Sequence, residues 1–382
     1  MKRFGAVVLM VCLFLGAMPL KTRAVDLQVG GKSACLMDVA TGTILYESNS
    51  HEPLAPASVT KVMTMLLIME AIDSGKIGWD DAVTASEAAA AKGGSQVYLK
   101  VGESMSVSDM VKSIAVSSAN DCACAMAEHL AGSENAFVEM MNARAKELGM
   151  NDTHFVNCTG LDDDENAKTH RTSAHDIAVM SRQLLKNHPD IKKFTTIWMD
   201  TVRNGAFGLS NTNKMVRFYE GCTGLKTGFT SGAGYCLSAS AQREGLELIA
   251  VVMGCATSQE RFAACKSMLD YGFANYSLVS AEAGEWTVPV KLGKAENVTA
   301  VPGESPQFLI DKARRSQVTT AVELEEAVTA PVSAGQRLGK LTIRVGEQVL
   351  AEIAVVAREP VQRLSFADLF VLALKHTAMS KL

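Results

Sequence analysis

Residues 54–74 have the sequence LAPASVTKVMTMLLIMEAIDS, and this stretch predicts the first long helix of the chain, from Ser58 to Ser74. Apolar side chains recur there at helical spacing, at positions 62, 65, 66, 69 and 72. Gly75 follows and ends the helix. Because residues three apart lie on one helical face, the Ser58 hydroxyl and the Lys61 amine are predicted to meet.

This serine and lysine suit the chemistry of a nucleophile and its base. A serine hydroxyl attacks poorly at neutral pH unless a base takes its proton. A lysine serves as that base when burial or a neighbouring cation lowers its pKa. Alone, the pattern S-x-x-K is weak, because most such pairs are ordinary surface residues.

The segments around this helix predict an α+β domain over residues 25–276. Residues 33–38 and 42–47 form one predicted β-hairpin, and residues 235–241 and 246–254 form another. Helical patterns lie between the hairpins, at residues 107–117, 121–131, 135–148 and 174–185. This order is typical of a domain whose sheet is built from both ends of its sequence.

The C-terminal part of the chain has a different pattern. Residues 277–360 contain short alternating segments broken by Gly and Pro, which predict a small β-sandwich domain with a structural rather than a binding role. Residues 361–382 predict an amphipathic helix that begins near Ser365 and Asp368. Two positions for this helix stay open, one in a membrane surface and one packed on its own domain.

Residues 1–24 predict a signal peptide. Lys2 and Arg3 precede an apolar run that ends at Met18, shorter than the roughly 20 residues of a spanning helix. We therefore favour a cleaved leader over an uncleaved membrane anchor. The mature protein is expected outside the cytoplasm, at the cell wall or on the outer face of the cytoplasmic membrane.

Charge and cysteine content narrow the classes of partner. The formal net charge is -4 and no basic cluster occurs, which excludes nucleic acid as an expected partner. Eight of the nine cysteines follow the predicted leader, an even number that would allow disulfides. Several lie in apolar stretches, so we expect mostly unpaired thiols in the core. No cysteine pair has the C-x-x-C spacing of a zinc site.

Two further segments carry side chains suited to the same chemistry as the serine and lysine. Residues 118–120, SAN, lie between predicted helices, where a hydroxyl can relay a proton and a carboxamide can hold a substrate amide. Residues 226–228, KTG, lie shortly before the predicted strand at residues 235–241, and an edge strand with this Lys, Thr and Gly could pair with an extended peptide and bind its carboxylate. Each segment alone is also explained as a helix N-cap or a turn.

Together, S-x-x-K, S-x-N and K-T-G occur in the order that resembles the low-molecular-mass penicillin-binding proteins, the serine D-alanyl-D-alanine carboxypeptidases. The resemblance includes residues 54–58, 116–121, 157–161 and 224–230 and the small C-terminal β domain. It implies a penicillin-binding/β-lactamase-like transpeptidase fold. It also implies trimming of peptidoglycan stem peptides that end in D-Ala-D-Ala, covalent inhibition by β-lactam antibiotics, and no cofactor or metal.

The same resemblance implies a role for each motif residue. Ser58 is the nucleophile, Lys61 is the general base and Ser118 relays a proton to the leaving D-alanine. Lys226 assists and lowers the pKa of Lys61. The implied substrate-binding residues are Lys226, Asn120, Thr227, Gly228, Phe229 and Arg261, with backbone N–H groups of Ser58 and Phe229 forming the oxyanion hole. Arg203 is a secondary candidate for the carboxylate.

Three other functions fit the sequence motifs less well. A class A β-lactamase needs the motif E-x-x-L-N, which residues 165–169, ENAKT, do not match. A non-catalytic penicillin-binding sensor would usually lose part of the motif set, and none is lost here. A zinc peptidase would use His170, His175 and Asp176, but no H-E-x-x-H or similar ligand pattern accompanies them.

Ala119 and Phe229 replace the Gly and His of some relatives, which affects the expected deacylation rate and pH optimum.

Overall fold

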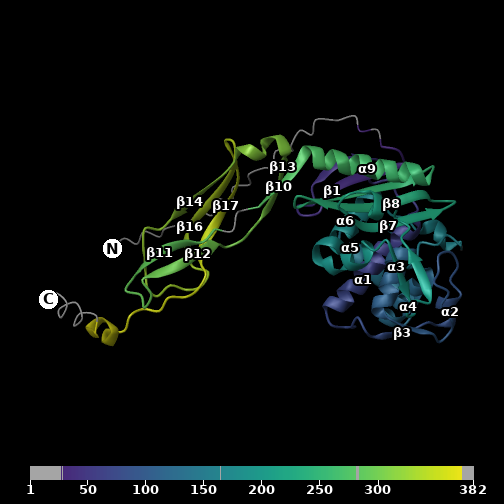
Figure 1. Cartoon of the computed structure of the whole chain (residues 1–382), viewed down its shortest axis with the longest axis horizontal. Helices are drawn as coiled ribbons and strands as arrows, with labels where there is room; N and C mark the ends of the chain where they lie inside the picture. The colour runs from purple at the N-terminus through teal and green to yellow at the C-terminus, as the bar shows by residue number, and fades with distance from the viewer. Residues whose placement is uncertain (1–26, 28, 164, 281–283, 372–382) are drawn as a thin grey trace, which may run out of the picture.

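The computed structural model describes residues 27, 29–163, 165–280 and 284–371, and the predicted leader lies outside them. Figure 1 shows two lobes, a helical lobe (residues 27–275) and a narrow β lobe (residues 276–371). The α+β class and the all-β C-terminal part are confirmed. Among the described residues, no helix is long and apolar enough to cross a membrane.

A five-stranded antiparallel sheet forms the centre of the helical lobe, in the order β2-β1-β9-β8-β7. Its strands are β1 (Ser33–Asp38), β2 (Ile44–Ser48), β7 (Cys222–Thr230), β8 (Gly234–Arg243) and β9 (Leu246–Cys255). Side chains on β9 alternate between the two faces, with Leu248 in one core cluster and Ile249 in the other. The sheet is therefore buried on both faces and has β7 at one edge.

Helices cover both faces of this sheet (Figure 1). The larger core contains α1 (Lys61–Asp73), α3 (Val107–Ser117), α4 (Asn120–Ala131), α5 (Glu134–Glu147) and α6 (Ala174–Asn187). The other face packs on α9 (Ser258–Asn275), a helix that was not predicted from the sequence pattern. The shorter helices are α2 (Glu87–Ala90), α7 (Lys192–Thr195) and α8 (Met215–Phe218).

Two small antiparallel sheets of two strands each complete the helical lobe, β3 (Ala82–Thr84) with β4 (Ser104–Ser106) and β5 (Met199–Val202) with β6 (Phe207–Ser210). Every cysteine in the described residues is a free thiol, and all but Cys222 are buried, as expected for core thiols.

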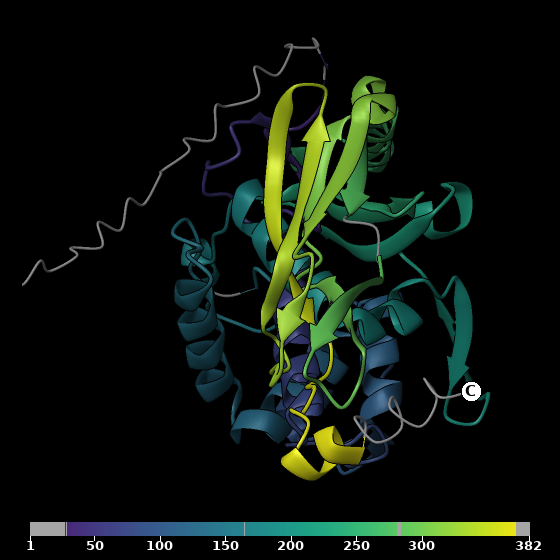
Figure 2. The same ribbon diagram turned by 90° about the vertical axis from the view of Figure 1, so that its left-hand side faces the viewer.

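The β lobe has a six-stranded sheet in the order β14-β16-β17-β12-β11-β15, and β10 pairs with β13 beside it. Figure 2 shows β16 and β17 as a long yellow ribbon. The strands are β10 (Tyr276–Ser280), β11 (Trp286–Lys291), β12 (Asn297–Pro302), β13 (Gln307–Asp311), β14 (Val318–Leu324), β15 (Val328–Thr329), β16 (Arg337–Val345) and β17 (Gln348–Ala357).

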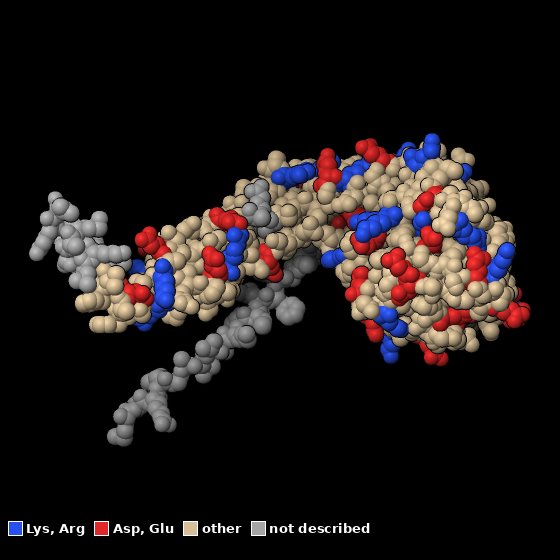
Figure 3. Space-filling view, turned by 60° about the horizontal axis from the view of Figure 1, so that its bottom comes forward, with Lys and Arg blue, Asp and Glu red and all other residues tan. Residues whose placement is uncertain are grey.

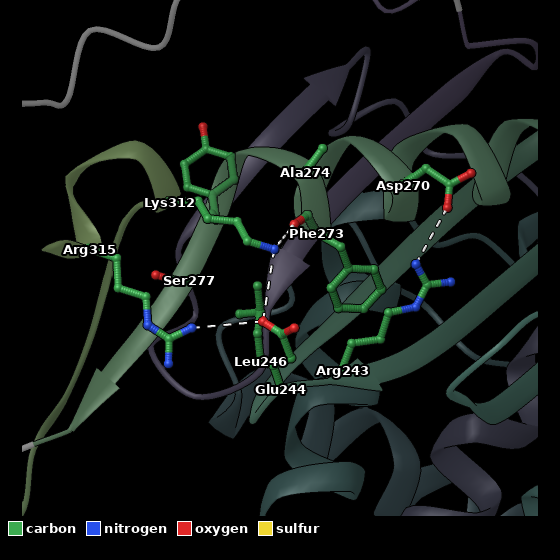
Figure 4. Close-up of a pocket in the computed structure, with 10 residues that line it drawn as sticks. Arg243, Glu244, Leu246, Asp270, Phe273, Ala274, Ser277, Lys312 and Arg315 are labelled. Atoms are coloured by element: carbon green, nitrogen blue, oxygen red, sulfur yellow. Dashed lines mark hydrogen bonds and ion pairs between the residues drawn. The ribbon is translucent and has the colours of Figure 1, made fainter.

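Polar contacts connect the two lobes where α9 meets β10. The 3₁₀ turn η4 (Lys312–Gln317) lies beside the β8–β9 turn, around a pocket of about 350 Å³ (Figure 4). Lys312 Nζ donates to Phe273 O at 3.2 Å. The Glu244 carboxylate lies 3.9 Å from Lys312 and 3.7 Å from Arg315, so these ion pairs contribute little individually. On the face shown in Figure 3, acidic and basic side chains are intermixed over both lobes.

The C-terminal helix begins as the sequence predicts. Ser365 and Asp368 bond reciprocally, from Asp368 N to Ser365 Oγ at 3.2 Å and from Ser365 N to Asp368 Oδ2 at 2.8 Å. Figure 1 places this helical turn at the end of the β lobe remote from the helical lobe. Residues 372–382 of the predicted helix lie outside the described residues.

Candidate active site

Ser58 lies on the 3₁₀ turn η1 (Ala57–Thr60), which leads into α1, rather than on the α-helix predicted from the sequence. Ala57 has φ +48°, a left-handed conformation that costs a residue with a β-carbon about 1–2 kcal/mol. Edge strand β7 passes beside this turn, since a β-carbon added to Gly228 would lie 2.6 Å from Pro56 O and 3.1 Å from Ser58 N. The turn therefore holds Ser58 against β7.

Lys61 is the buried amine next to this serine. Its Nζ lies 2.9 Å from Ser58 Oγ and 2.8 Å from Thr159 O. Burial lowers the pKa of Lys61 to about 7, although the neighbouring Cys158 and Asp121 side chains oppose the shift. The structure thus brings the hydroxyl and the amine together, and near neutral pH a substantial fraction of the amine is able to accept a proton.

Lys226, on β7, is a second buried lysine. Its Nζ donates to Thr227 O at 2.9 Å. Burial and then the positive charges of Lys61 and Arg261 hold the pKa of Lys226 well below its usual value. The resemblance implied that Lys226 lowers the pKa of Lys61, whereas in the structure burial is the cause of that lowering.

Residues 118–120 form a tight turn between α3 and α4, which both pack on α1. Ser118 has φ +63° and Asn120 is already the first residue of α4. Asn120 Nδ2 donates to Gly93 O at 2.7 Å. Its Oδ1 is buried and has no hydrogen-bond partner among the described residues. An unpaired buried acceptor is costly, so this oxygen is an exception among the buried polar atoms of the site.

The next residue, Asp121, holds the backbone of residues 97–99 in place. Its carboxylate accepts hydrogen bonds from Val97 N at 3.1 Å and Leu99 N at 3.0 Å. Arg203 donates to Val97 O at 2.7 Å and to Glu103 Oε1 at 2.6 Å. The guanidinium of Arg203, the secondary candidate for the substrate carboxylate, is therefore engaged in holding residues 97–103.

The Thr227 hydroxyl has a partner that the sequence does not indicate. Thr227 Oγ1 lies 2.6 Å from Thr212 Oγ1, and Thr212 N donates to Val116 O at 3.2 Å. Segment 211–213 therefore connects the KTG strand to the end of α3. A loop threonine has no characteristic sequence pattern, so only the fold identifies it.

Arg261 reaches β7 from α9. Its Nη1 donates to Gly228 O at 2.9 Å and to Cys236 O at 3.3 Å, and its buried Nε has no partner among the described residues. Its guanidinium carbon lies 5.3 Å from the centre of the Tyr235 ring. Phe229 is 53% exposed and stacks on the same ring at 4.3 Å. Arg261 thus ties β7 to β8 directly behind the KTG motif.

The two histidines considered as zinc ligands have different hydrogen-bond partners. His170 Nε2 lies 2.8 Å from Thr60 Oγ1, and His175 Nδ1 lies 3.2 Å from Asp176 Oδ1. Within the part of the chain that the structure describes, no group of three or more His, Cys, Asp and Glu side chains could hold a metal ion.

Comparisons with known proteins give a family for each lobe. The model of the family "D-alanyl-D-alanine carboxypeptidase" matches residues 20–257, and that of "Penicillin-binding protein 5, C-terminal domain" matches residues 273–363. The D-alanyl-D-alanine carboxypeptidase DacF of Bacillus subtilis is 43% identical over 351 residues, which cover 90% of this chain and 89% of the relative.

Solved structures agree with these matches. Penicillin-binding protein 5 of Haemophilus influenzae is 31% identical with a TM-score of 0.69, covering 88% of this chain and 98% of that one. Penicillin-binding protein D2 of Listeria monocytogenes, in its ampicillin-bound form, is 31% identical with a TM-score of 0.59, covering 65% of this chain and 100% of that one.

Proposed function

The chain belongs to the D-alanyl-D-alanine carboxypeptidase family of serine peptidases, and from this premise we propose which of its side chains carry the reaction. The protein is a serine-type D-Ala-D-Ala carboxypeptidase that removes the terminal D-alanine from peptidoglycan pentapeptide stems and is a target of penicillin. One observation carries the assignment of roles: buried Lys61 Nζ lies 2.9 Å from Ser58 Oγ.

In the first step, neutral Lys61 takes the proton of the Ser58 hydroxyl while Oγ bonds to the carbonyl carbon between the two D-alanines. The carbonyl oxygen becomes an oxyanion. Backbone N–H groups of Ser58 and Phe229 hold it, each such donor being worth roughly 3–4 kcal/mol in the transition state. The closeness of Gly228 to Ser58 N supports this role for the β7 backbone.

In the second step the carbon–nitrogen bond breaks, and the proton held on Lys61 passes through Ser118 to the nitrogen of the leaving D-alanine, assisted by Lys226. The unpaired Asn120 Oδ1 accepts an N–H of the stem peptide, and the Thr227 hydroxyl binds the terminal carboxylate with Arg261 behind it. Water then hydrolyses the ester on Oγ, which restores the serine and releases the shortened peptide.

The proposed base predicts a pH dependence of acylation. Only neutral Lys61 accepts a proton, so the rate constant for acylation by a labelled penicillin should fall as pH drops through about 7. It should be roughly tenfold below its plateau one pH unit below that pKa. Stopped acylation reactions between pH 5.5 and 9 test this, and a flat profile from pH 6 to 8 would reject Lys61 as the base.

We also propose that the protein is exported and contacts the membrane surface through its C-terminal helix. Phe366 is 84% exposed and Phe370 is 59% exposed, so the first turn of this helix presents apolar side chains to its surroundings. After expression of the whole precursor, cell fractionation should recover the protein outside the cytoplasm, on the membrane.

A variant with Phe366→Ser and Phe370→Ser should move to the soluble fraction. Phe218→Ser is the matched control, because Phe218 is 72% exposed but lies on the helical lobe. Equal membrane recovery of all three proteins would contradict the contact through the helix, and recovery in the cytoplasm would contradict export.

A further inference from the structure

His170 is a buried histidine whose two ring nitrogens are both bonded, and it lies behind the turn that carries Ser58. Its Nδ1 accepts a hydrogen bond from Val156 N at 3.1 Å, and its Nε2 lies 2.8 Å from Thr60 Oγ1. The side chain is 3% exposed, and its ring packs edge-on against Phe155 at 5.6 Å. A surface or metal-binding histidine would not have this environment.

These partners determine which nitrogen carries the proton. A backbone N–H can only donate, so Nδ1 must be the unprotonated nitrogen and Nε2 carries hydrogen. Nε2–H then donates to the Thr60 hydroxyl, which in turn donates to Ala57 O at 2.8 Å. Burial, with the positive charges of His154 and Arg171, lowers the pKa of His170 to about 4, in agreement with a neutral ring.

This chain of bonds ends on the strained residue that precedes the nucleophile. Left-handed residues such as Ala57 persist only where the surroundings fix them. The Thr60 hydroxyl holds the Ala57 carbonyl, and this peptide group contains Ser58 N, the proposed donor to the oxyanion. The orientation of that donor therefore depends on Thr60, and through Thr60 on His170.

We propose that His170 is a positioning residue for the nucleophile: its Nε2–H orients the Thr60 hydroxyl, which fixes the Ala57–Ser58 peptide group for the reaction. This inference rests on the proposed role of Ser58. His170 does not touch the substrate and transfers no proton. It should therefore affect the rate of acylation and not the binding of the stem peptide.

Substitution of His170 by Asn or Gln tests the two hydrogen bonds of its ring separately. In His170→Asn the amide oxygen replaces Nδ1 and keeps the bond from Val156, but the donor to Thr60 is lost. In His170→Gln the amide nitrogen reaches the position of Nε2 and keeps the donor. We expect acylation by labelled penicillin and kcat for D-alanine release to fall about 10- to 100-fold in the Asn variant, with KM unchanged. The Gln variant should retain most of the wild-type rate.

Thr60 provides the second arm of the experiment. Thr60→Val should reproduce the loss and Thr60→Ser should not. Adding His170→Asn to Thr60→Val should cost no further activity, because both changes break one chain of bonds. His154→Gln, at an exposed neighbouring histidine, is the control. The proposal would be overturned if His170→Asn acylates at the wild-type rate. It would also be overturned if the loss of acylation rate in the double variant equals the product of the losses in the two single variants.

A spectroscopic measurement separates this proposal from the assignment of Ser58. ¹⁵N NMR of the imidazole should show the proton of His170 on Nε2 in the resting protein, whatever residue is acylated. A proton on Nδ1 would reject the positioning role alone. Penicillin labelling at a residue other than Ser58 would reject the proposed nucleophile and leave the bond network standing.

Discussion

Replacing Ser58 by alanine is expected to abolish both D-alanine release and covalent labelling by penicillin. The variant lacks the side-chain oxygen that the proposed mechanism joins to the substrate. Loss of a serine nucleophile of this kind costs about 10⁶-fold in kcat. Release from a diacetyl-lysyl-D-alanyl-D-alanine peptide and the mass of the penicillin-treated protein measure the two activities. The fold should survive, because Lys61 keeps its bond to Thr159 O.

The comparison has a matched control and distinct contradicting results. Ser104→Ala removes a hydroxyl from an exposed position on β4 and should leave both activities unchanged. If D-alanine release persists in Ser58→Ala, the nucleophile lies elsewhere. If the wild-type protein hydrolyses penicillin rapidly and ignores the peptide, it acts as a β-lactamase-like hydrolase instead.

The Ser58 and Lys61 pair shows what sequence can predict about this site. Three-residue spacing was sufficient to expect a contact, and the 2.9 Å separation agrees with it. The backbone around the pair was not predictable. Ala57 and Ser118 both have positive φ although neither is glycine, and tertiary contacts rather than local preference hold them there.

Contacts made by main-chain atoms also could not be predicted from the sequence. Lys61 bonds Thr159 through a carbonyl oxygen, a group that every residue has, so no side-chain pattern marks this partner. Helix α9 was missed for a related reason. Its buried face includes the small residues Ala264, Cys265 and Gly272, which give a weak apolar pattern. Gly272 nevertheless lets the helix approach the sheet, since a β-carbon there would lie 2.3 Å from Leu248.

Among substitutions outside the proposed catalytic residues, we expect Gly160→Ala to cause the largest loss of stability and of acylation rate. Gly160 has φ +80°, and a β-carbon there would lie 1.9 Å from Ala57 O and 2.7 Å from Thr60 Oγ1. The obstructing atoms include backbone next to the nucleophile, so they cannot rotate away. We expect a loss of about 3–5 kcal/mol in the free energy of unfolding. Acylation should fall at least about 100-fold, because relief of the clash displaces the turn that carries Ser58.

Gly132→Ala separates the clash from the conformational cost of replacing a glycine. Gly132 has φ +82°, nearly the same as Gly160, but no atom lies within 4 Å of an added β-carbon. The Gly132→Ala variant should therefore lose only about 1–2 kcal/mol in the free energy of unfolding, which is the cost of the left-handed conformation, and should keep the full rate of acylation. Urea unfolding and penicillin labelling of both variants measure the difference. Equal stabilities and equal labelling rates would mean that the turn moves freely, and that the close packing of Gly160 on Ala57 does not hold the nucleophile in place.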